Sequence, residues 1–278
     1  MNSEECLKQF TTDLQYRLAK STLEDYQRSV KQLFIFTKKP FDGITKRDIR
    51  NWLSHLVENG YRPATVQVRL SGLKTFFNYC KEEELILLNP AEELPFPRRD
   101  ETVPCYLKWE QLTQLRKHVE RGLRERALIE VLYTTGVRIS ELAAMKKEDI
   151  NWSERSILIP SGKGKKGRNV FFTPECAEYL EVYLNKRTDN LPYVFSDAKG
   201  IQSFRISTNK LMFRTISKQL GFKVTNHILR HTFAAHLAQK GMPLEYIQVL
   251  LGHHNIQTTK VYTRLYDIAR KEMYDDWM

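Results

Sequence analysis

The stretch Ser156-Ile157-Leu158-Ile159-Pro160-Ser161-Gly162-Lys163-Gly164-Lys165-Lys166-Gly167-Arg168-Asn169-Val170-Phe171-Phe172 decides the fold class of this chain. It places two short β-prone runs on either side of a turn rich in glycine and lysine, which is the pattern of a β-hairpin. The sequence on both sides of it has helical character instead. We therefore predict a mainly α-helical protein with a small antiparallel β-sheet.

Helical segments flank the hairpin. Residues 109–119, 125–134 and 140–145 are predicted to form helices before it. Helices resume from Pro174 and continue to the end, interrupted by the short apolar stretch Tyr193-Val194-Phe195.

The first ninety residues read as consecutive amphipathic helices. One helix follows a cap at Ser21 or Thr22, and its apolar residues recur at spacings of three and four. Thr45 and Asp48 resemble a capping box that opens a second helix, which stops at Gly60. Pro63 begins a third, with a core stripe made of Val66, Leu70, Leu73, Phe76 and Phe77.

The segment between Asn89-Pro90 and Pro104 breaks the helical pattern with prolines and mixed charge, as a linker does. We therefore predict two domains, residues 1–98 and residues 99–278.

Composition points to an anionic partner. Lys and Arg number 44 against 33 Asp and Glu, which gives a formal net charge of +11. Residues 1–98 hold 15 basic and 13 acidic side chains, and residues 99–278 hold 29 and 20, so the excess lies in the second half. No apolar run approaches the roughly 20 residues that span a bilayer, and the start is acidic, so we expect a cytoplasmic protein. Four scattered cysteines indicate neither a zinc ribbon nor a disulfide framework.

Arg138 follows Thr135-Gly136-Val137 at the mouth of a predicted helix. A guanidinium there can hold phosphate oxygens bidentately, and Glu141 could orient it. Taken alone, an exposed arginine near a helix start explains the pattern equally well.

The predicted hairpin tip carries four cations in seven residues. Its glycines let the backbone approach a DNA strand, so that a lysine such as Lys163 could protonate a leaving oxygen. Lys165, Lys166 and Arg168 are expected to contact backbone phosphates. The alternative is a solvated turn.

A further helix start is predicted at Val224-Thr225-Asn226, with Thr225 as its cap. His227 and Arg230 then share a face in the first turns, where the helix dipole favours an anion. His231 lies four residues from His227, which is a zinc spacing, but an arginine on the same face would repel a cation. We expect no metal site.

His253 follows Leu251-Gly252, and Tyr262 comes nine residues later. On its own, Tyr262 could simply be a core residue of a helix-turn-helix. Together with two arginines, a second histidine and a lysine, it specifies phosphoryl transfer to a tyrosine, because the cations neutralise a pentavalent phosphate while the phenol attacks.

In the order and spacing of these motifs the chain resembles the tyrosine recombinases, the family of phage integrases and Xer-type recombinases. The resemblance is strongest at Thr135 to Leu142, at His227 to Ala234, and from Leu251-Gly252-His253 to Tyr262-Thr263. It implies that Arg138 and Arg230 hold the scissile phosphate, that Lys163 is the general acid and His227 an acid/base group, and that His253 stabilises the transition state for the nucleophile Tyr262.

The resemblance also implies a helical core-binding domain and a catalytic domain that close as a C-shaped clamp on DNA. Strands would be exchanged through a 3′-phosphotyrosine and a Holliday junction, by a homotetramer on two DNA sites with inverted-repeat cores. The bond energy stays in the covalent link, so no metal, ATP or other cofactor is expected.

Two other functions stay open at this point. A type IB topoisomerase uses the same chemistry but reseals the original strand. A non-enzymatic regulator could use residues 243–262 as a helix-turn-helix, although it has no use for Lys163 or Arg138.

Overall fold

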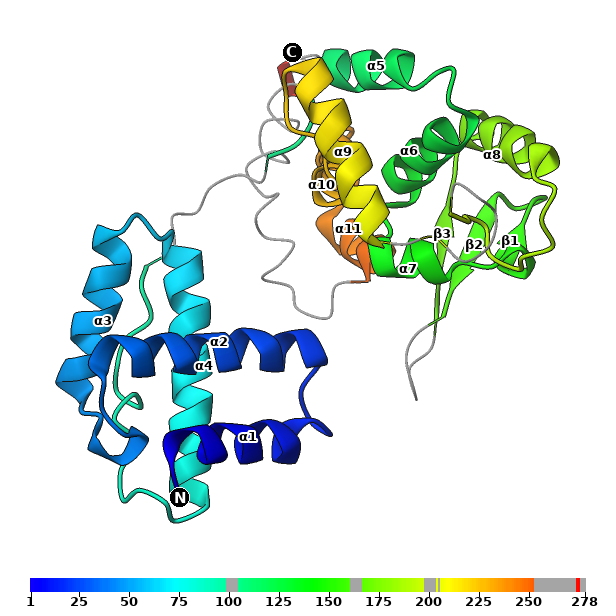
Figure 1. Cartoon of the computed structure of the whole chain (residues 1–278). Coiled ribbons are helices and arrows are strands. Elements are labelled where there is room, and N and C mark those ends of the chain that lie inside the picture. Colours follow the sequence, from blue (N-terminus) through cyan, green and yellow to red (C-terminus); the bar gives the residue numbers. More distant parts are fainter. Residues whose placement is uncertain (99–104, 161–166, 198–203, 205, 253–273, 276–278) are drawn as a thin grey trace. The chain divides into compact units, whose positions relative to one another are not determined.

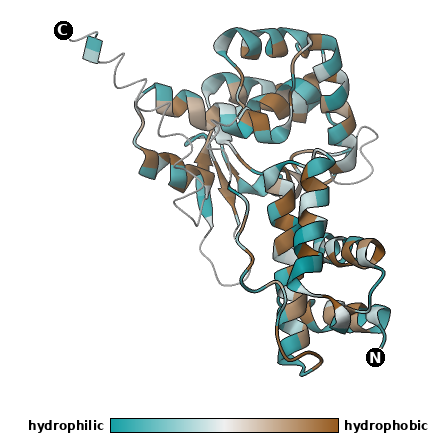
Figure 2. Ribbon diagram, turned by 90° about the vertical axis from the view of Figure 1, so that its left-hand side faces the viewer, coloured by the Kyte–Doolittle hydropathy of each residue, from teal (hydrophilic) through white to brown (hydrophobic). Residues whose placement is uncertain are grey.

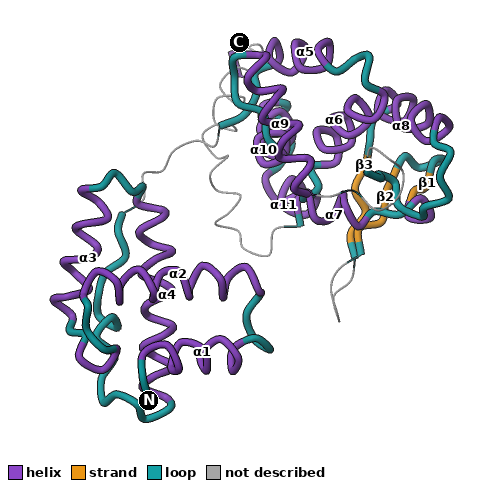
Figure 3. The backbone as a smooth tube through the Cα atoms, viewed as in Figure 1, coloured by secondary structure: helices purple, strands orange, loops and turns teal. Residues whose placement is uncertain are grey.

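The structure is a computed structural model that describes residues 1–98, 105–160, 167–197, 204, 206–252 and 274–275 (Figure 1). The chain divides into two compact units, Met1–Asp100 and Glu101–Met278. Helices dominate both units, and the second also holds a three-stranded antiparallel sheet (Figure 3). The predicted mainly helical fold with a small antiparallel sheet is confirmed.

The first unit is built from amphipathic helices around one hydrophobic core. Figure 2 shows hydrophobic and hydrophilic residues alternating around the helices, as expected for elements with one buried face. Phe10, Phe76 and Phe77 are fully buried at its centre. Its elements are α1 (Ser3–Leu14), α2 (Lys20–Thr37), η1 (Phe41–Gly43), α3 (Lys46–Glu58) and α4 (Pro63–Glu82).

Helix starts in this unit follow local sequence signals in most cases. Thr45 and Asp48 form the predicted capping box of α3, and Pro63 is the first residue of α4. The predicted cap of α2 at Ser21 or Thr22 is wrong. The helix begins at Lys20 after Ala19, which makes no side-chain cap hydrogen bond, and Leu23 in its first turn is buried in the core.

The predicted linker starts too early in the sequence. Ala91 and Leu94 are buried in the core of the first unit, and the carbonyl of Glu92 accepts a hydrogen bond from Lys74 Nζ at 2.9 Å. Ala91 and Leu94 therefore attach this Pro-rich segment to the core of the first unit, and the bond from Lys74 ties it to α4.

The second unit surrounds a larger core with helices and the sheet. The helix α6 is buried along most of its length and contacts α8 and α10. Its elements are α5 (Trp109–His118), α6 (Leu123–Thr135), α7 (Ile139–Ala144), η2 (Lys147–Asp149), β1 (Ile150–Asn151), β2 (Ser156–Ile159), β3 (Arg168–Phe171), α8 (Pro174–Lys186), α9 (Ile206–Leu220), α10 (Asn226–Gln239) and α11 (Leu244–Leu251).

The sheet has the strand order β1-β2-β3, and β2 and β3 form the predicted hairpin. Ile157 pairs with Val170, and Ile159 pairs with Arg168. Ile157, Ile159 and Val170 are buried while Leu158 and Phe171 are exposed, so one face of the hairpin packs on the core. This register puts Arg168 on the packed face.

The end of α11 lies where several elements of the second unit meet. Phe233 of α10 and Leu251 of α11 belong to one hydrophobic cluster, and α11 also contacts β3. Among the described residues, no helix has the length and apolar character that crossing a membrane requires.

Candidate functional site

Arg138 is positioned by the tight turn between α6 and α7. Gly136 ends α6 with a φ of +61°, and its N–H donates to the carbonyl of Leu132 at 3.2 Å. A Cβ at Gly136 would lie 2.4 Å from a ring carbon of Phe233, so this close approach requires glycine. Arg138 then caps α7, at the predicted mouth of a helix.

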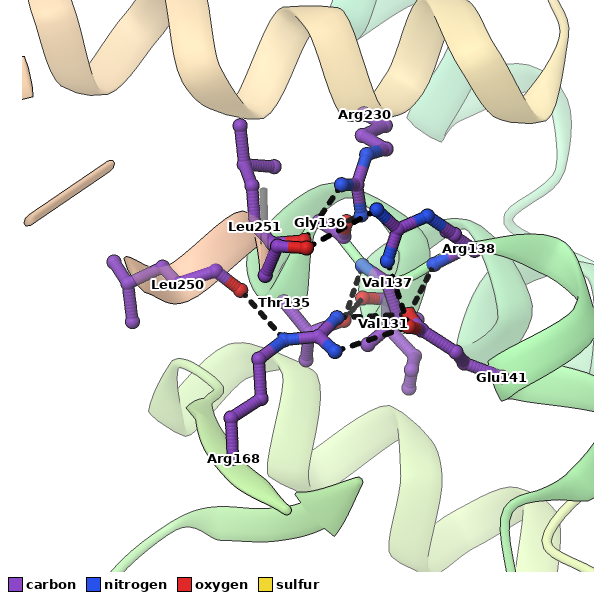
Figure 4. Close-up of polar contacts among 11 residues, drawn as sticks. Val131, Thr135, Gly136, Val137, Arg138, Glu141, Arg168, Arg230, Leu250 and Leu251 are labelled. Atoms are coloured by element: carbon purple, nitrogen blue, oxygen red, sulfur yellow. Dashed lines mark hydrogen bonds and ion pairs between the residues drawn. The ribbon is translucent and has the colours of Figure 1, made fainter. Parts of the chain in front are cut away.

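Glu141 receives four hydrogen bonds from two arginines (Figure 4). Its Oε1 accepts from Arg138 Nη1 and from Arg168 Nη1, both at 3.0 Å. Its Oε2 accepts from the backbone N–H of Arg138 at 2.7 Å and from Arg168 Nη2 at 2.8 Å. Burial favours the protonated acid, but the bonds from Arg168 and Arg138 outweigh it and lower the pKa of Glu141 to about 2. Glu141 is therefore a carboxylate at neutral pH, and it accepts hydrogen bonds from both the backbone and the guanidinium of Arg138.

Arg230 comes from α10, a helix capped as predicted by Thr225, whose Oγ1 accepts from the N–H of Ile228 at 3.1 Å. The Arg230 side chain is buried, and its Nη1 donates to the carbonyl of Gly136 at 2.5 Å. Its Nη2 donates to the carbonyl of Leu251 at 2.6 Å. Two backbone segments far apart in sequence are joined by this one guanidinium.

Three consecutive carbonyls at the end of α11 each accept a hydrogen bond from a different arginine (Figure 4). Arg168 Nε donates to Leu250 at 3.0 Å, and Arg138 Nη2 donates to Gly252 at 3.2 Å. Leu251, between them, accepts from Arg230. The last carbonyls of a helix have no partners within it and carry its negative dipole end, so cations are favourable there.

His227 is exposed in the first turn of α10, one turn before Arg230. His231 is half-buried, and burial together with the charges of His227 and Arg230 lowers its pKa. Within the part of the chain that the structure describes, no three metal-ligating side chains come together in a group that could hold a metal ion.

The structure thus brings together Arg138, Glu141, Arg168 and Arg230, and it places His227 on the helix that carries Arg230. The remaining predicted site residues lie outside the described residues: Lys163, Lys165, Lys166, His253 and Tyr262.

Sequence reasoning missed the environment of Arg168. It was expected to contact DNA phosphates from the hairpin tip, but its side chain is only 18% exposed and pairs with Glu141. The alternation of side chains along β3 could have indicated this, because Arg168 and Val170 lie on the same face of the strand and Val170 is buried.

Comparison with known proteins identifies the family of the chain. The model of the phage integrase family matches residues 106–268, and that of the phage integrase N-terminal SAM-like domain matches residues 6–87. The tyrosine recombinase XerC of Chlamydia pneumoniae is 35% identical over 250 residues, covering 85% of this chain and 79% of the relative. That of Staphylococcus aureus strain COL is 31% identical over 279 residues, covering 95% and 92%.

Solved structures show the same likeness. The crystal structure of XerA recombinase is 31% identical with a TM-score of 0.57, and the match covers 98% of both chains. The Tn1549 transposon integrase in complex with transposon right end DNA is similar in fold, with a TM-score of 0.78, 20% identity and complete coverage of both chains. The chain therefore belongs to the phage integrase family of tyrosine recombinases, the enzymes of site-specific recombination that cleave and rejoin DNA strands.

Proposed function

We propose that this recombinase cleaves duplex DNA by attack of Tyr262 on a scissile phosphate held by Arg138 and Arg230. The observation that carries the proposal is the meeting of these two arginines, from α7 and α10, on adjacent carbonyls at the end of α11. The chain continues from there directly into His253 and reaches Tyr262 ten residues after Gly252. The arrangement concentrates positive charge where a phosphoryl group would develop negative charge.

The two arginines differ in how they are held. Arg230 is buried and fixed by two backbone carbonyls, so it is preorganised. The Arg138 side chain is 42% exposed and keeps one guanidinium edge on Glu141. It can therefore exchange its bond to the Gly252 carbonyl for a phosphate oxygen while Glu141 holds its orientation.

In the proposed cleavage step, side chains of the protein accept and supply every proton, so no cofactor is needed. A tyrosine with a pKa of about 10 is neutral at physiological pH, so His227 takes the phenol proton as the oxygen attacks phosphorus. The bond from phosphorus to the 5′ oxygen breaks, and Lys163 protonates that oxygen. His253 donates to the phosphoryl oxygens in the transition state. The products are a 3′-phosphotyrosine and a free 5′-hydroxyl.

Rejoining runs the same steps in reverse. A 5′-hydroxyl attacks the phosphotyrosine, its proton returns to Lys163, and Tyr262 leaves with the proton from His227. The covalent link conserves the energy of the broken bond, so no ATP is needed. If the attacking hydroxyl comes from the partner duplex, the result is strand exchange through a Holliday junction.

We assign residues 1–98 to binding of the core site and residues 99–278 to catalysis. The match of the first segment to the N-terminal SAM-like domain and of the second to the phage integrase model supports this division. The partner is duplex DNA with an inverted-repeat core, consistent with the net charge of +11 and with integrase relatives solved on DNA. Four protomers on two such sites would complete the reaction.

A suicide-substrate assay tests the chemistry. A nicked core site lets the short 5′-hydroxyl fragment diffuse away, so the parent protein is trapped as a covalent adduct that survives denaturation. Tyr262→Phe should abolish the adduct while binding DNA with nearly the parental affinity, because only the phenol oxygen is lost. Tyr266→Phe is the matched control, at a tyrosine four positions later in the sequence. Adduct formation by Tyr262→Phe and not by Tyr266→Phe would overturn the assignment.

The recombination reaction itself is tested with native DNA. Covalent cleavage sites mapped on DNA flanking the native gene, and at the chromosomal terminus, would identify the target. A plasmid with two copies of that target should yield products with exchanged flanks. Relaxed plasmid without such products would instead indicate a topoisomerase-like activity.

A further inference from the structure

Arg168 is an unexpected member of the arginine cluster. It comes from the start of β3, five positions after Lys163 in the sequence. All three guanidinium nitrogens donate hydrogen bonds. Nε donates to the carbonyl of Leu250, and Nη1 and Nη2 donate to the two carboxylate oxygens of Glu141. One side chain thus joins β3, α7 and the end of α11.

The Arg168 guanidinium packs against the backbone of Gly252, a contact that requires an arginine at one position and a glycine at the other. A Cβ at Gly252 would lie 2.8 Å from Arg168 Nη1 and 2.9 Å from Cζ, so the planar group lies directly against the Gly252 backbone. Gly252 has a φ of +63°, which ends α11 and turns its last carbonyls toward the arginines. A lysine could supply the charge but not the fork that reaches a carboxylate and a carbonyl at once.

These contacts argue against a direct role of Arg168 in binding DNA. To reach a phosphate, the guanidinium would have to leave a carboxylate that is only 17% exposed and give up all three of these hydrogen bonds. Removing one partner of this half-buried pair is unfavourable, because the remaining charge loses its compensation.

We infer that Arg168 is a positioning residue for DNA cleavage, which acts through Glu141 and through the end of α11 rather than by touching the scissile phosphate. This inference rests on the proposed roles of Arg138 and Arg230.

The charge balance explains how Arg168 would act. Arg138, Arg168 and Glu141 together carry one net positive charge, so Arg138 retains attraction for a phosphate while Glu141 orients it. If residue 168 no longer held the two oxygens of Glu141, as expected for Arg168→Lys, Glu141 would pair with Arg138 alone, and that pair would be neutral. The phosphate would then compete with a buried carboxylate for the same guanidinium.

The backbone contact explains a second effect. The bond from Arg168 Nε fixes Leu250 two residues before Gly252, and His253 follows directly in the sequence. A displacement of this helix end by about 1 Å is enough to slow a reaction on the order of a hundredfold when it moves reacting groups.

The test compares Arg168→Lys with the parent on the nicked core site, at DNA concentrations that saturate binding. We expect single-turnover cleavage to fall about 10- to 100-fold, the scale of a misplaced catalytic group. DNA affinity and its dependence on salt should stay at the parental values. A salt dependence shallower by about one unit, with parental cleavage at saturation, would show a phosphate contact and overturn the inference. Parental values in both measurements would overturn it as well.

Arg187→Lys is the matched control for general loss of stability. Arg187 is also buried, pairs bidentately with Asp189 and donates to the carbonyls of Tyr193 and Val194, but it has no contact with Glu141 or α11 among its hydrogen bonds. Thermal unfolding should show similar destabilisation of the two variants, and only Arg168→Lys should lose cleavage at saturation. An equal loss of cleavage in both would reduce Arg168 to a structural role.

A double-mutant cycle that combines Arg168→Lys with Glu141→Gln tests whether Arg168 acts through Glu141. If Arg168 acts mainly through Glu141, the two substitutions together should slow cleavage far less than the product of their separate effects. Independent, multiplicative effects would overturn this route. Arg138→Ala in the same assay separates the two levels: parental cleavage by Arg138→Ala would refute the proposed site, whereas slow cleavage by it and fast cleavage by Arg168→Lys would refute only this inference.

Discussion

Arg138 and Arg230 donate to neighbouring carbonyls of one helix end, Arg138 Nη2 to Gly252 at 3.2 Å and Arg230 Nη2 to Leu251 at 2.6 Å. The two residues are separated by ninety-two positions in sequence, and α11 supplies the common point that brings their guanidinium groups together. Helix-terminal carbonyls and phosphate oxygens are both acceptors with negative charge. The end of α11 therefore aligns the same donors that the proposed reaction uses.

Replacing either arginine should slow cleavage, but with different effects on stability. Arg138→Ala and Arg230→Ala should each reduce the single-turnover rate at least about a hundredfold, as for loss of one preorganised donor to a transition-state oxyanion. Arg230→Ala should also lower the free energy of unfolding by about 1–3 kcal/mol, because it leaves two buried carbonyls without this donor. Urea unfolding measures that difference. Parental cleavage rates in the two variants would remove these arginines from the site.

The metal-free mechanism predicts that EDTA leaves the cleavage rate of the parent protein unchanged, because cations of the chain neutralise the phosphate. The same nicked substrate with and without chelator provides the measurement. Cleavage that is lost in EDTA and restored by zinc would instead support a zinc site at His227 and His231.

The roles of Lys163, Lys165 and Lys166, which lie between β2 and β3 in the sequence, can be separated by changing the leaving group. A general acid is needed only for a poor leaving group, so a substrate with sulfur in place of the scissile 5′ oxygen should restore cleavage by Lys163→Ala. Lys165→Ala and Lys166→Ala should show weaker binding with a salt dependence shallower by about one unit each, and sulfur should not repair them. Rescue of either of these and not of Lys163→Ala would move the general acid.

The ionised Glu141 carboxylate should contribute to the free energy of unfolding in a way that depends on pH. Its pKa is lowered from 4.5 to about 2 in the folded protein, so the stabilisation is present above pH 4.5 and is lost as the pH falls through about 2. At neutral pH this lowering corresponds to roughly 3 kcal/mol. The stability difference between the parent and Glu141→Gln, from urea unfolding, should therefore shrink as the pH falls from 4.5 toward 2. Glu148→Gln, at an exposed ion pair with Lys146, is the control and should change stability by less than about 1 kcal/mol. A difference that does not vary with pH would contradict this assignment.

Gly252→Ala should disturb the arginine cluster beyond ordinary backbone strain. A side chain on a residue with left-handed backbone angles destabilises the fold by roughly 1–2 kcal/mol. At Gly252 the new Cβ would also clash with the Arg168 guanidinium. Gly221→Ala is the matched control, because Gly221 has a φ of +74° and nothing within 4 Å of the added carbon. Both variants should lose stability in thermal unfolding, and only Gly252→Ala should lose cleavage at saturating DNA. Equal cleavage by the two would show that Arg168 can shift without consequence.

Local signals in the sequence determined much of the fold. Thr45 with Asp48 and Thr225 mark helix starts because a cap side chain bonds a backbone N–H three residues on, and Pro63 marks one because its fixed φ suits the first helical position. The β-prone runs specified the hairpin. The order of the arginine, histidine and tyrosine motifs indicated the recombinase family, which the comparisons confirm. Helix starts, the hairpin and the motif order depend on residues close together in the chain, so they can be predicted from the spacing of residue types.

Only the tertiary structure decided how the arginines are used. Arg168, Arg230 and Arg138 reach carbonyls that lie 82, 21 and 114 positions away, and no local period encodes such pairs. From the sequence alone, Arg168 is expected to contact a DNA phosphate. In the structure it lies on the packed face of β3, and its guanidinium pairs with Glu141. The same limit misplaced the start of the linker, because burial of Ala91 and Leu94 depends on a core assembled from distant helices. Sequence specified which charged groups the protein carries, and long-range packing determined which of them hold one another in place.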